Sequence, residues 1–424
     1  MRQRFRRGCG ESLIGRRGTG GPLCAGHEVA ESSGVGVRLF LKTTAAATLA
    51  LVALLFIWRA GAAASTAPAC AGESGFIPGF CVAVPTGPAI RRETTVALAS
   101  VASASADLRV EAGIPASEAL RIAGALDRAS AQVERAFGRP FSQRPRVLLF
   151  ASRASFARGI ADLFAYAPDV AESAAASYGG IVDQRTLTVA VDFRATAGND
   201  LPGLLAHELV HVMIRQTAGL DANLPAWFEE GLATVIQSDD GRPAGTDVLV
   251  ARSLVANHVV SLDGVATFGD WHRSYQRVGR PQYTVAADAV RAMEDRVGEA
   301  GLVRALDAVG AGARFADAYA SLGAGPLGEF VAAFEASSAR PGLVVNRAAS
   351  MGGDAVWTAY AFAPDAPLVV RISGDNGYEL TFRVTTDDLG MYRGSFGSTA
   401  PSGRYKIQVT GGATTALVAF DSGR

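Results

Sequence analysis

The spacing of apolar residues divides the chain into a largely helical region followed by a region of short strands. From residue 117 to residue 338, apolar residues recur every three or four positions over long segments, which is typical of amphipathic helices. Helices are predicted over residues 117–137, 152–164, 201–219 and 223–237 and, in several pieces, over 284–338. Strands are predicted over residues 146–150 and, as a β-hairpin, over residues 178–193.

After Gly342 the pattern changes to alternating apolar and polar residues, in short runs separated by Gly, Asp, Pro and Ser. Such a pattern predicts short strands with one buried face, and a succession of them predicts a small β-sandwich of the immunoglobulin or fibronectin type III kind. We therefore expect an α+β protein in which an all-β domain at residues 343–424 follows a mixed domain.

The composition is that of a folded protein, because 49% of the residues are hydrophobic and 19% are charged. The 40 basic and 40 acidic residues balance, so no excess of positive charge points to a nucleic-acid partner. The balance is uneven along the chain, since eight basic and three acidic residues precede Thr43.

The basic head leads into an uncharged apolar run at residues 43–58, which is followed by small residues ending in the A-x-A pattern of Ala62 and Ala64. These are the parts of an export signal. Its length leaves two alternatives open, which are cleavage near Ala64 and retention as a membrane anchor. Both alternatives place the rest of the chain outside the cytoplasm, secreted or anchored by residues 43–58. Residues 1–64 would then be a targeting segment and residues 65–93 a linker.

All four cysteines lie within the first 81 residues. None lies in the largely helical region from residue 117 to residue 338, so a thiol nucleophile is not expected there. Cys70 and Cys81 follow the export segment and would meet an oxidising compartment, where a disulfide between them is one possibility and two free thiols the other.

The predicted helix at residues 201–219 carries the pattern H-E-x-x-H as His207, Glu208 and His211. Residues four apart lie on one face of a helix, so both imidazoles can bind one Zn²⁺ ion. Glu208 lies beside that face, where a carboxylate can take a proton from the water that the zinc activates. The pattern rarely arises by chance in a chain with five histidines.

A third ligand is required, and a metzincin would supply it as a histidine at position 217. Thr217 excludes that class. The next predicted helix, residues 223–237 with Asn223 as its expected N-cap, offers Glu230, nineteen positions after His211. These segments resemble the gluzincins and most closely the bacterial peptidase MA-like family, whose members carry a segment like LPxWFxEGLA; this chain reads LPAWFEEGLA.

The resemblance covers about residues 115–340 and implies a zincin-like metallopeptidase domain, placed at residues 94–340, with a small mixed sheet, an active-site helix and a helical C-terminal part. It implies that Glu230 is the zinc ligand and that Glu229 supports the site or faces solvent. Helix register alone leaves the exchanged assignment of the two glutamates open. Some relatives carry a supporting carboxylate one turn later, where this chain has Thr234.

A family motif after the ligand helix aligns with residues 282–298 and implies that Tyr283 stabilises the oxyanion of the reaction. The match is partial, since Ala286 and Ala287 replace a serine and a second tyrosine of the motif. His258 and His272 are alternatives for this role.

In gluzincins an upstream edge strand pairs with the substrate backbone, and residues 177–182 are the matching stretch. Gly179 and Gly180 would let a substrate chain approach closely, although an ordinary glycine-rich start of a strand is an equal alternative. The function expected from the residues and the resemblance together is a zinc-dependent peptidase that binds one Zn²⁺ and acts on a peptide or protein substrate. The alternatives are a zinc-containing binding module without activity and a surface-interaction protein that acts through its β-sandwich.

Overall fold

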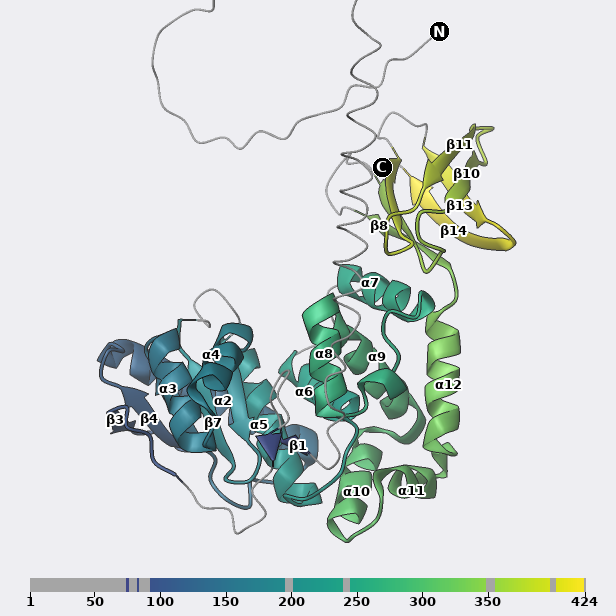
Figure 1. Cartoon of the computed structure of the whole chain (residues 1–424). Coiled ribbons are helices and arrows are strands. Elements are labelled where there is room, and N and C mark those ends of the chain that lie inside the picture. Colours follow the sequence, from purple (N-terminus) through teal and green to yellow (C-terminus); the bar gives the residue numbers. More distant parts are fainter. Residues whose placement is uncertain are drawn as a thin grey trace, which may run out of the picture. The chain divides into compact units, whose positions relative to one another are not determined.

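The computed structural model describes residues 74–75, 82–83, 92–194, 201–238, 245–347, 355–396 and 402–422 (Figure 1). All of them belong to one compact unit, Cys70–Arg424. The predicted export segment, Cys70 and Cys81 lie outside the described residues. Within the described ranges, every helix is too short or too polar to cross a membrane.

A mixed sheet of five strands forms the first part of the fold. The central strands β4, β5 and β7 run parallel to one another, and the edge strands β3 and β6 are antiparallel to their neighbours. In spatial order the sheet consists of β3 (Leu98–Val101), β4 (Asp107–Glu111), β5 (Arg146–Phe150), β7 (Thr188–Asp192) and β6 (Gly180–Asp183). The predicted hairpin is therefore confirmed as β6 and β7, and β6 is an edge strand.

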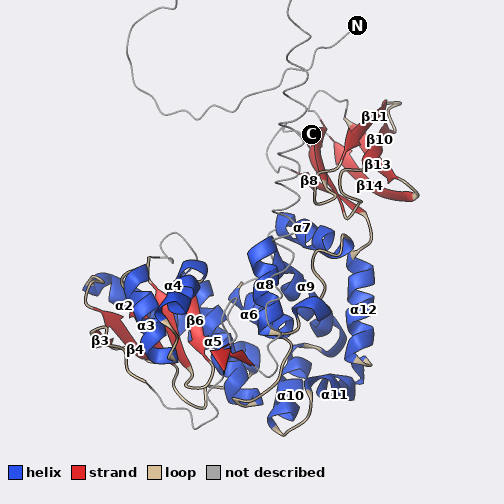
Figure 2. Ribbon diagram, in the orientation of Figure 1, coloured by secondary structure: helices blue, strands red, loops and turns tan. Residues whose placement is uncertain are grey.

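Helices cover both faces of this sheet (Figure 2). On β5, Val147 and Leu149 pack with α2 (Ala116–Phe137) and α5 (Leu201–Ala218). The alternate residues Leu148 and Phe150 pack on the other face with α3 (Arg153–Phe164) and α4 (Pro168–Ser177). A strand between two helical layers must be apolar on both sides, as RVLLF is, and each large apolar side chain buried in this way contributes about 1.5–3 kcal/mol.

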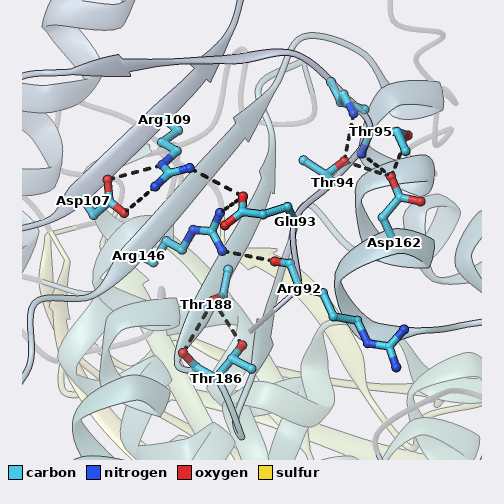
Figure 3. A network of polar contacts seen from close by, with 11 residues as sticks. Arg92, Glu93, Thr94, Thr95, Asp107, Arg109, Arg146, Asp162, Thr186 and Thr188 are labelled. Atoms are coloured by element: carbon cyan, nitrogen blue, oxygen red, sulfur yellow. Dashed lines mark hydrogen bonds and ion pairs between the residues drawn. The ribbon is translucent and has the colours of Figure 1, made fainter. Parts of the chain in front are cut away.

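The segment that leads into β3 is fixed to the sheet by polar contacts (Figure 3). Glu93 accepts hydrogen bonds from Arg109 and from Arg146, whose side chain is 1% exposed. Nearby, Asp162 of α3 accepts bonds from the backbone and hydroxyl of Thr95 at 2.7 Å each. The sheet is thus held at the start of the described chain by charge-assisted contacts with residues far away in sequence.

Helices alone form the middle of the unit, and two of them pack very closely. A Cβ atom at Gly231 of α6 would overlap the carbonyl oxygen of Ala286 in α9, so glycine is required there for the two helices to approach. The helices are α6 (Ala226–Gln237), α7 (Gly245–Ala256), α8 (Phe268–Val278), α9 (Pro281–Val297), α10 (Glu299–Gly310), α11 (Phe315–Tyr319) and α12 (Leu327–Ser338), with a 3₁₀ turn at Asp263–Val265 and a π-turn at Ala320–Ala324.

Two small antiparallel sheets follow and enclose a core that includes Trp357, Ile407 and Tyr405. Along β10 and β13, buried and exposed residues alternate, as the period of two predicts. One sheet consists of β11 (Glu379–Thr385), β10 (Pro367–Gly374), β13 (Gly403–Gly411) and β14 (Thr414–Ser422), and the other of β12 (Tyr392–Phe396), β9 (Ala355–Tyr360) and β8 (Gly342–Arg347). The α+β class is confirmed.

One predicted helix start is wrong. Asn223 was expected to cap the helix over residues 223–237, but α6 begins at Ala226 and its N-cap is Pro225 in an extended conformation. Proline fits this position because its fixed φ and missing N–H favour the edge of a helix over its interior.

Candidate metal centre

Helix α5 places two imidazoles side by side. His207 and His211 are four residues apart, lie on the same face, and have ring centroids 5.2 Å apart. Both are buried, at 8% and 6% exposure. The helix ends as the sequence predicts, because Gly219 follows with a φ of 95° and donates its N–H to the carbonyl of Arg215.

Helix α6 brings Glu230 to the same point. Its Oε2 lies 3.3 Å from Nε2 of His207 and 3.7 Å from Nε2 of His211. One ligand atom from each residue lies within 4.8 Å of the others, and in the described part of the chain this is the one group of three or more potential ligands of this kind. Two imidazole nitrogens and a carboxylate oxygen that face one another could hold a single metal ion.

The other ring nitrogen of His207, Nδ1, also has a hydrogen-bond partner. Its Nδ1 donates to Oε1 of Gln237 at 3.1 Å, which leaves Nε2 to face Glu230. Hydrogen bonds of this kind fix the tautomer and orientation of an imidazole ligand. Thr234 does not take this role, because its hydroxyl donates to the carbonyl of Glu230 in its own helix. Gln237 was not predicted, although its position two turns after Glu230 on the same helix face could have indicated it.

Glu229 lies outside the ligand group. It is 0% exposed and accepts a hydrogen bond from Nη2 of Arg215, so it does not face solvent. The structure groups Glu230, and not Glu229, with the two histidines. The two neighbouring glutamates thus face different ring nitrogens of His211, Nδ1 for Glu229 and Nε2 for Glu230, since side chains one residue apart point about 100° apart around a helix.

Glu208 is buried beside the histidines and lies against the edge strand β6. A Cβ atom at Gly180 would lie 2.6 Å from Oε1 of Glu208 and 2.9 Å from its Cδ. The absence of a side chain at Gly180 therefore makes room for the Glu208 carboxylate. Gly179 stands just before the strand, where its carbonyl accepts the N–H of Asp192 at 2.9 Å.

Burial and charge act in opposite directions in this group. Burial raises the pKa of the Glu208 carboxyl above its ordinary value, although the neighbouring histidines oppose this. For Glu230, burial also favours the neutral form, but the charge of His211 and the hydrogen bond and charge of His207 outweigh it and lower the pKa. Burial alone would lower the pKa of His211, yet Glu230 and Glu229 raise it to about 9. A metal ion that bound here would have to displace that proton, so its binding would release protons.

Aromatic side chains surround the histidines on the side of α8 and α9. Tyr283 forms a T-shaped contact with His207, with ring centroids 5.8 Å apart, and its ring also contacts Trp271 and Tyr275. Burial, together with the charge of Glu230, raises the pKa of Tyr283 well above its ordinary value. Its hydroxyl is therefore neutral and can donate a hydrogen bond.

The two alternative histidines are placed apart from the ligand group. His272 is buried on α8, where its Nδ1 is hydrogen-bonded to the hydroxyl of Tyr178. Burial, assisted by the charge of Arg273, lowers the pKa of His272 to about 4, so the ring is neutral at neutral pH. His258 is exposed in the turn after α7. Tyr178, just before Gly179 and Gly180, lies in the stretch matched to the substrate-binding strand, but no role was predicted for its hydroxyl.

Comparison with known protein families found no family model that matches the chain, and comparison with curated proteins found no match either. A buried group of two histidines and a glutamate on adjacent helices indicates a metal-dependent function.

Proposed function

We propose that this chain is a zinc-dependent peptidase of the gluzincin type that hydrolyses peptide bonds. The observation that carries the proposal is the position of Glu208. It is a buried carboxylate that stands beside the group of His207, His211 and Glu230 without belonging to it. A site that only held a structural metal would have no need of such a carboxylate.

Zinc suits this donor set best. Imidazole nitrogens together with one carboxylate are the ligands of catalytic zinc sites, and three protein ligands leave a fourth position open for water or substrate. When bound, the ion would lower the pKa of a water molecule and polarise the carbonyl that is attacked. The residues that would hold it are His207, His211 and Glu230.

Glu208 would move the proton. Its carboxylate accepts a proton from the attacking water and later delivers it to the amine that leaves. Burial raises the pKa of this carboxyl, which makes it a stronger base than an exposed glutamate. Tyr283, with its neutral hydroxyl, is our candidate for the hydrogen bond to the oxyanion that forms on the former carbonyl.

The edge strand β6 would hold the substrate. The strand pairs with β7 on one side, as Gly180 with Val191 and Val182 with Val189, and an extended peptide could pair with the backbone on its other side. Because Glu208 touches Gly180, a peptide bound along this edge would run past the proton acceptor.

We further propose that the enzyme acts outside the cytoplasm, secreted or anchored by residues 43–58, because that run has the composition of an export signal. Its partner is then a peptide or a protein in that compartment, and Cys70 and Cys81 would meet oxidising conditions there.

Metal analysis of the purified full-length protein tests the proposal. The wild type should contain about one zinc per chain, since three ligands define one site, and should cleave casein or a peptide library. His211→Ala should lose the zinc, whereas His258→Ala, which changes an exposed histidine, should retain it. A wild type that binds zinc but cleaves no peptide would favour a non-catalytic binding module.

A further inference from the structure

A buried ion pair lies next to His211, one of the proposed metal ligands. Arg215 follows His211 by one helical turn on α5, and Glu229 precedes Glu230 on α6. The two side chains are 4% and 0% exposed, and Nη2 of Arg215 donates to Oε1 of Glu229. Charged groups removed from water in this way are costly unless they have partners, so the arrangement calls for a reason.

The second carboxylate oxygen of Glu229 faces the imidazole. Its Oε2 lies 3.9 Å from Nδ1 of His211, while Nε2 of the same ring lies 3.7 Å from Glu230. Among the described residues, both this Oε2 and this Nδ1 are buried without a hydrogen-bond partner. A shift of about 1 Å would bring them to hydrogen-bond distance. The pair thus stands on the side of His211 opposite to the point where a metal would bind.

Arg215 makes a further contact that joins the two ligand helices. Its Nη1 donates to the carbonyl of Ala222 at 2.6 Å, in the loop between α5 and α6. One guanidinium therefore connects the helix of His211, the loop and the helix of Glu230. Its planar shape and several donors allow these contacts at the same time, which a lysine could not reproduce.

We propose that Arg215 and Glu229 are positioning residues for metal binding. Glu229 accepts the Nδ1–H of His211 when Nε2 binds the metal, and Arg215 holds the carboxylate in that direction and balances its charge. The inference rests on the proposed metal site and deepens it. It also makes the two histidines unequal, because His207 is supported by the neutral amide of Gln237 and His211 by a carboxylate.

The zinc affinity of the metal-free protein, measured by competition with a chelator, tests this. Glu229→Gln should weaken zinc binding about 10- to 100-fold. This substitution leaves Arg215 without a counter-charge, so the free energy of unfolding of the variant should fall as well. The double variant Arg215→Met/Glu229→Gln removes both charges and should recover stability, measured by urea unfolding, while zinc binding stays weak.

Arg146→Met is the matched control. Arg146 is also buried and paired with a glutamate, but it lies on β5 and contacts Glu93 and the Arg92 carbonyl instead of a ligand. It should lose stability and keep the zinc affinity of the wild type. An equal loss of affinity in this control, or a wild-type affinity in the double variant, would overturn the positioning role. A wild type that binds no zinc would instead overturn the proposed function itself.

Discussion

Gly180 and Glu208 are in direct contact, and this contact joins the proposed proton acceptor to the edge of the sheet. The carboxylate of Glu208 occupies the space that a Cβ atom at Gly180 would need, with its Oε1 only 2.6 Å from that position. The spacing of His207, Glu208 and His211 on one helix accounts for a candidate metal site, but it does not say where a substrate would bind. The contact with β6 indicates where a substrate could bind, because it places the edge of a sheet beside the Glu208 carboxylate.

Gly180→Ala should therefore impair catalysis without removing the metal. The added methyl group must push the Glu208 carboxylate aside, and a misplacement of about 1 Å can cost on the order of 100-fold in rate. Zinc content and peptide hydrolysis, measured on the same preparation, separate the two effects. Gly328→Ala on α12 is the control, since a Cβ atom there meets nothing within 4 Å. Unchanged hydrolysis in Gly180→Ala would mean that Glu208 has room to move.

Tyr283→Phe tests the donor to the oxyanion. Loss of one such donor costs about 10²–10³ in kcat, and KM should change little because the bond strengthens only in the transition state. Tyr319→Phe serves as a control, since Tyr319 is a fully buried tyrosine of α11 that packs on Phe330. If Tyr178→Phe lowers kcat and Tyr283→Phe does not, the hydroxyl that is bonded to His272 is the donor instead.

His272 should make the stability of the protein depend on pH. Burial, assisted by Arg273, lowers the pKa of this imidazole from 6.5 to about 4. Between these two values the unfolded chain binds a proton that the folded protein does not. The free energy of unfolding should therefore decrease as the pH falls from about 6.5 to about 4, and this contribution should level off below pH 4.

Urea unfolding at a series of pH values checks this prediction. His272→Asn keeps a polar side chain of similar size near Tyr178 but cannot titrate, so its stability should vary less with pH over this window than that of the wild type. Equal pH dependence in the two proteins would show that His272 is not the group responsible.

Much of the fold could be predicted because its elements have strong local signals. The strand RVLLF and the helix that ends just before Gly219 are where the sequence places them. The strand Leu98–Val101 and the helix Pro168–Ser177 were not predicted. The first is a short edge strand, and the second contains mostly small residues, so neither has a clear apolar period.

The candidate ligands could be predicted as well, because two of them share one helix and the third lies in a specific segment of sequence. Their supports were predicted only in part, since Glu229 was expected to support the site or face solvent and Gln237 was not expected. Gln237 reaches His207, and Glu229 reaches Arg215, only because α5 and α6 pack together. Gly180 was expected either to admit a substrate chain or to be an ordinary glycine at the start of a strand, whereas in the structure it makes room for Glu208. Contacts of this kind depend on tertiary packing, which local periodicity does not specify.

The most direct test of the account is Glu208→Gln, which keeps the shape of the side chain and removes its ability to accept a proton. Zinc content and hydrolysis of casein or a peptide library are measured for the variant and the wild type. We predict that the variant retains about one zinc per chain, as its three ligands are unchanged. Its rate of hydrolysis should fall by about 10²–10⁴-fold. A variant that binds zinc and cleaves peptides as fast as the wild type would contradict the proposed mechanism.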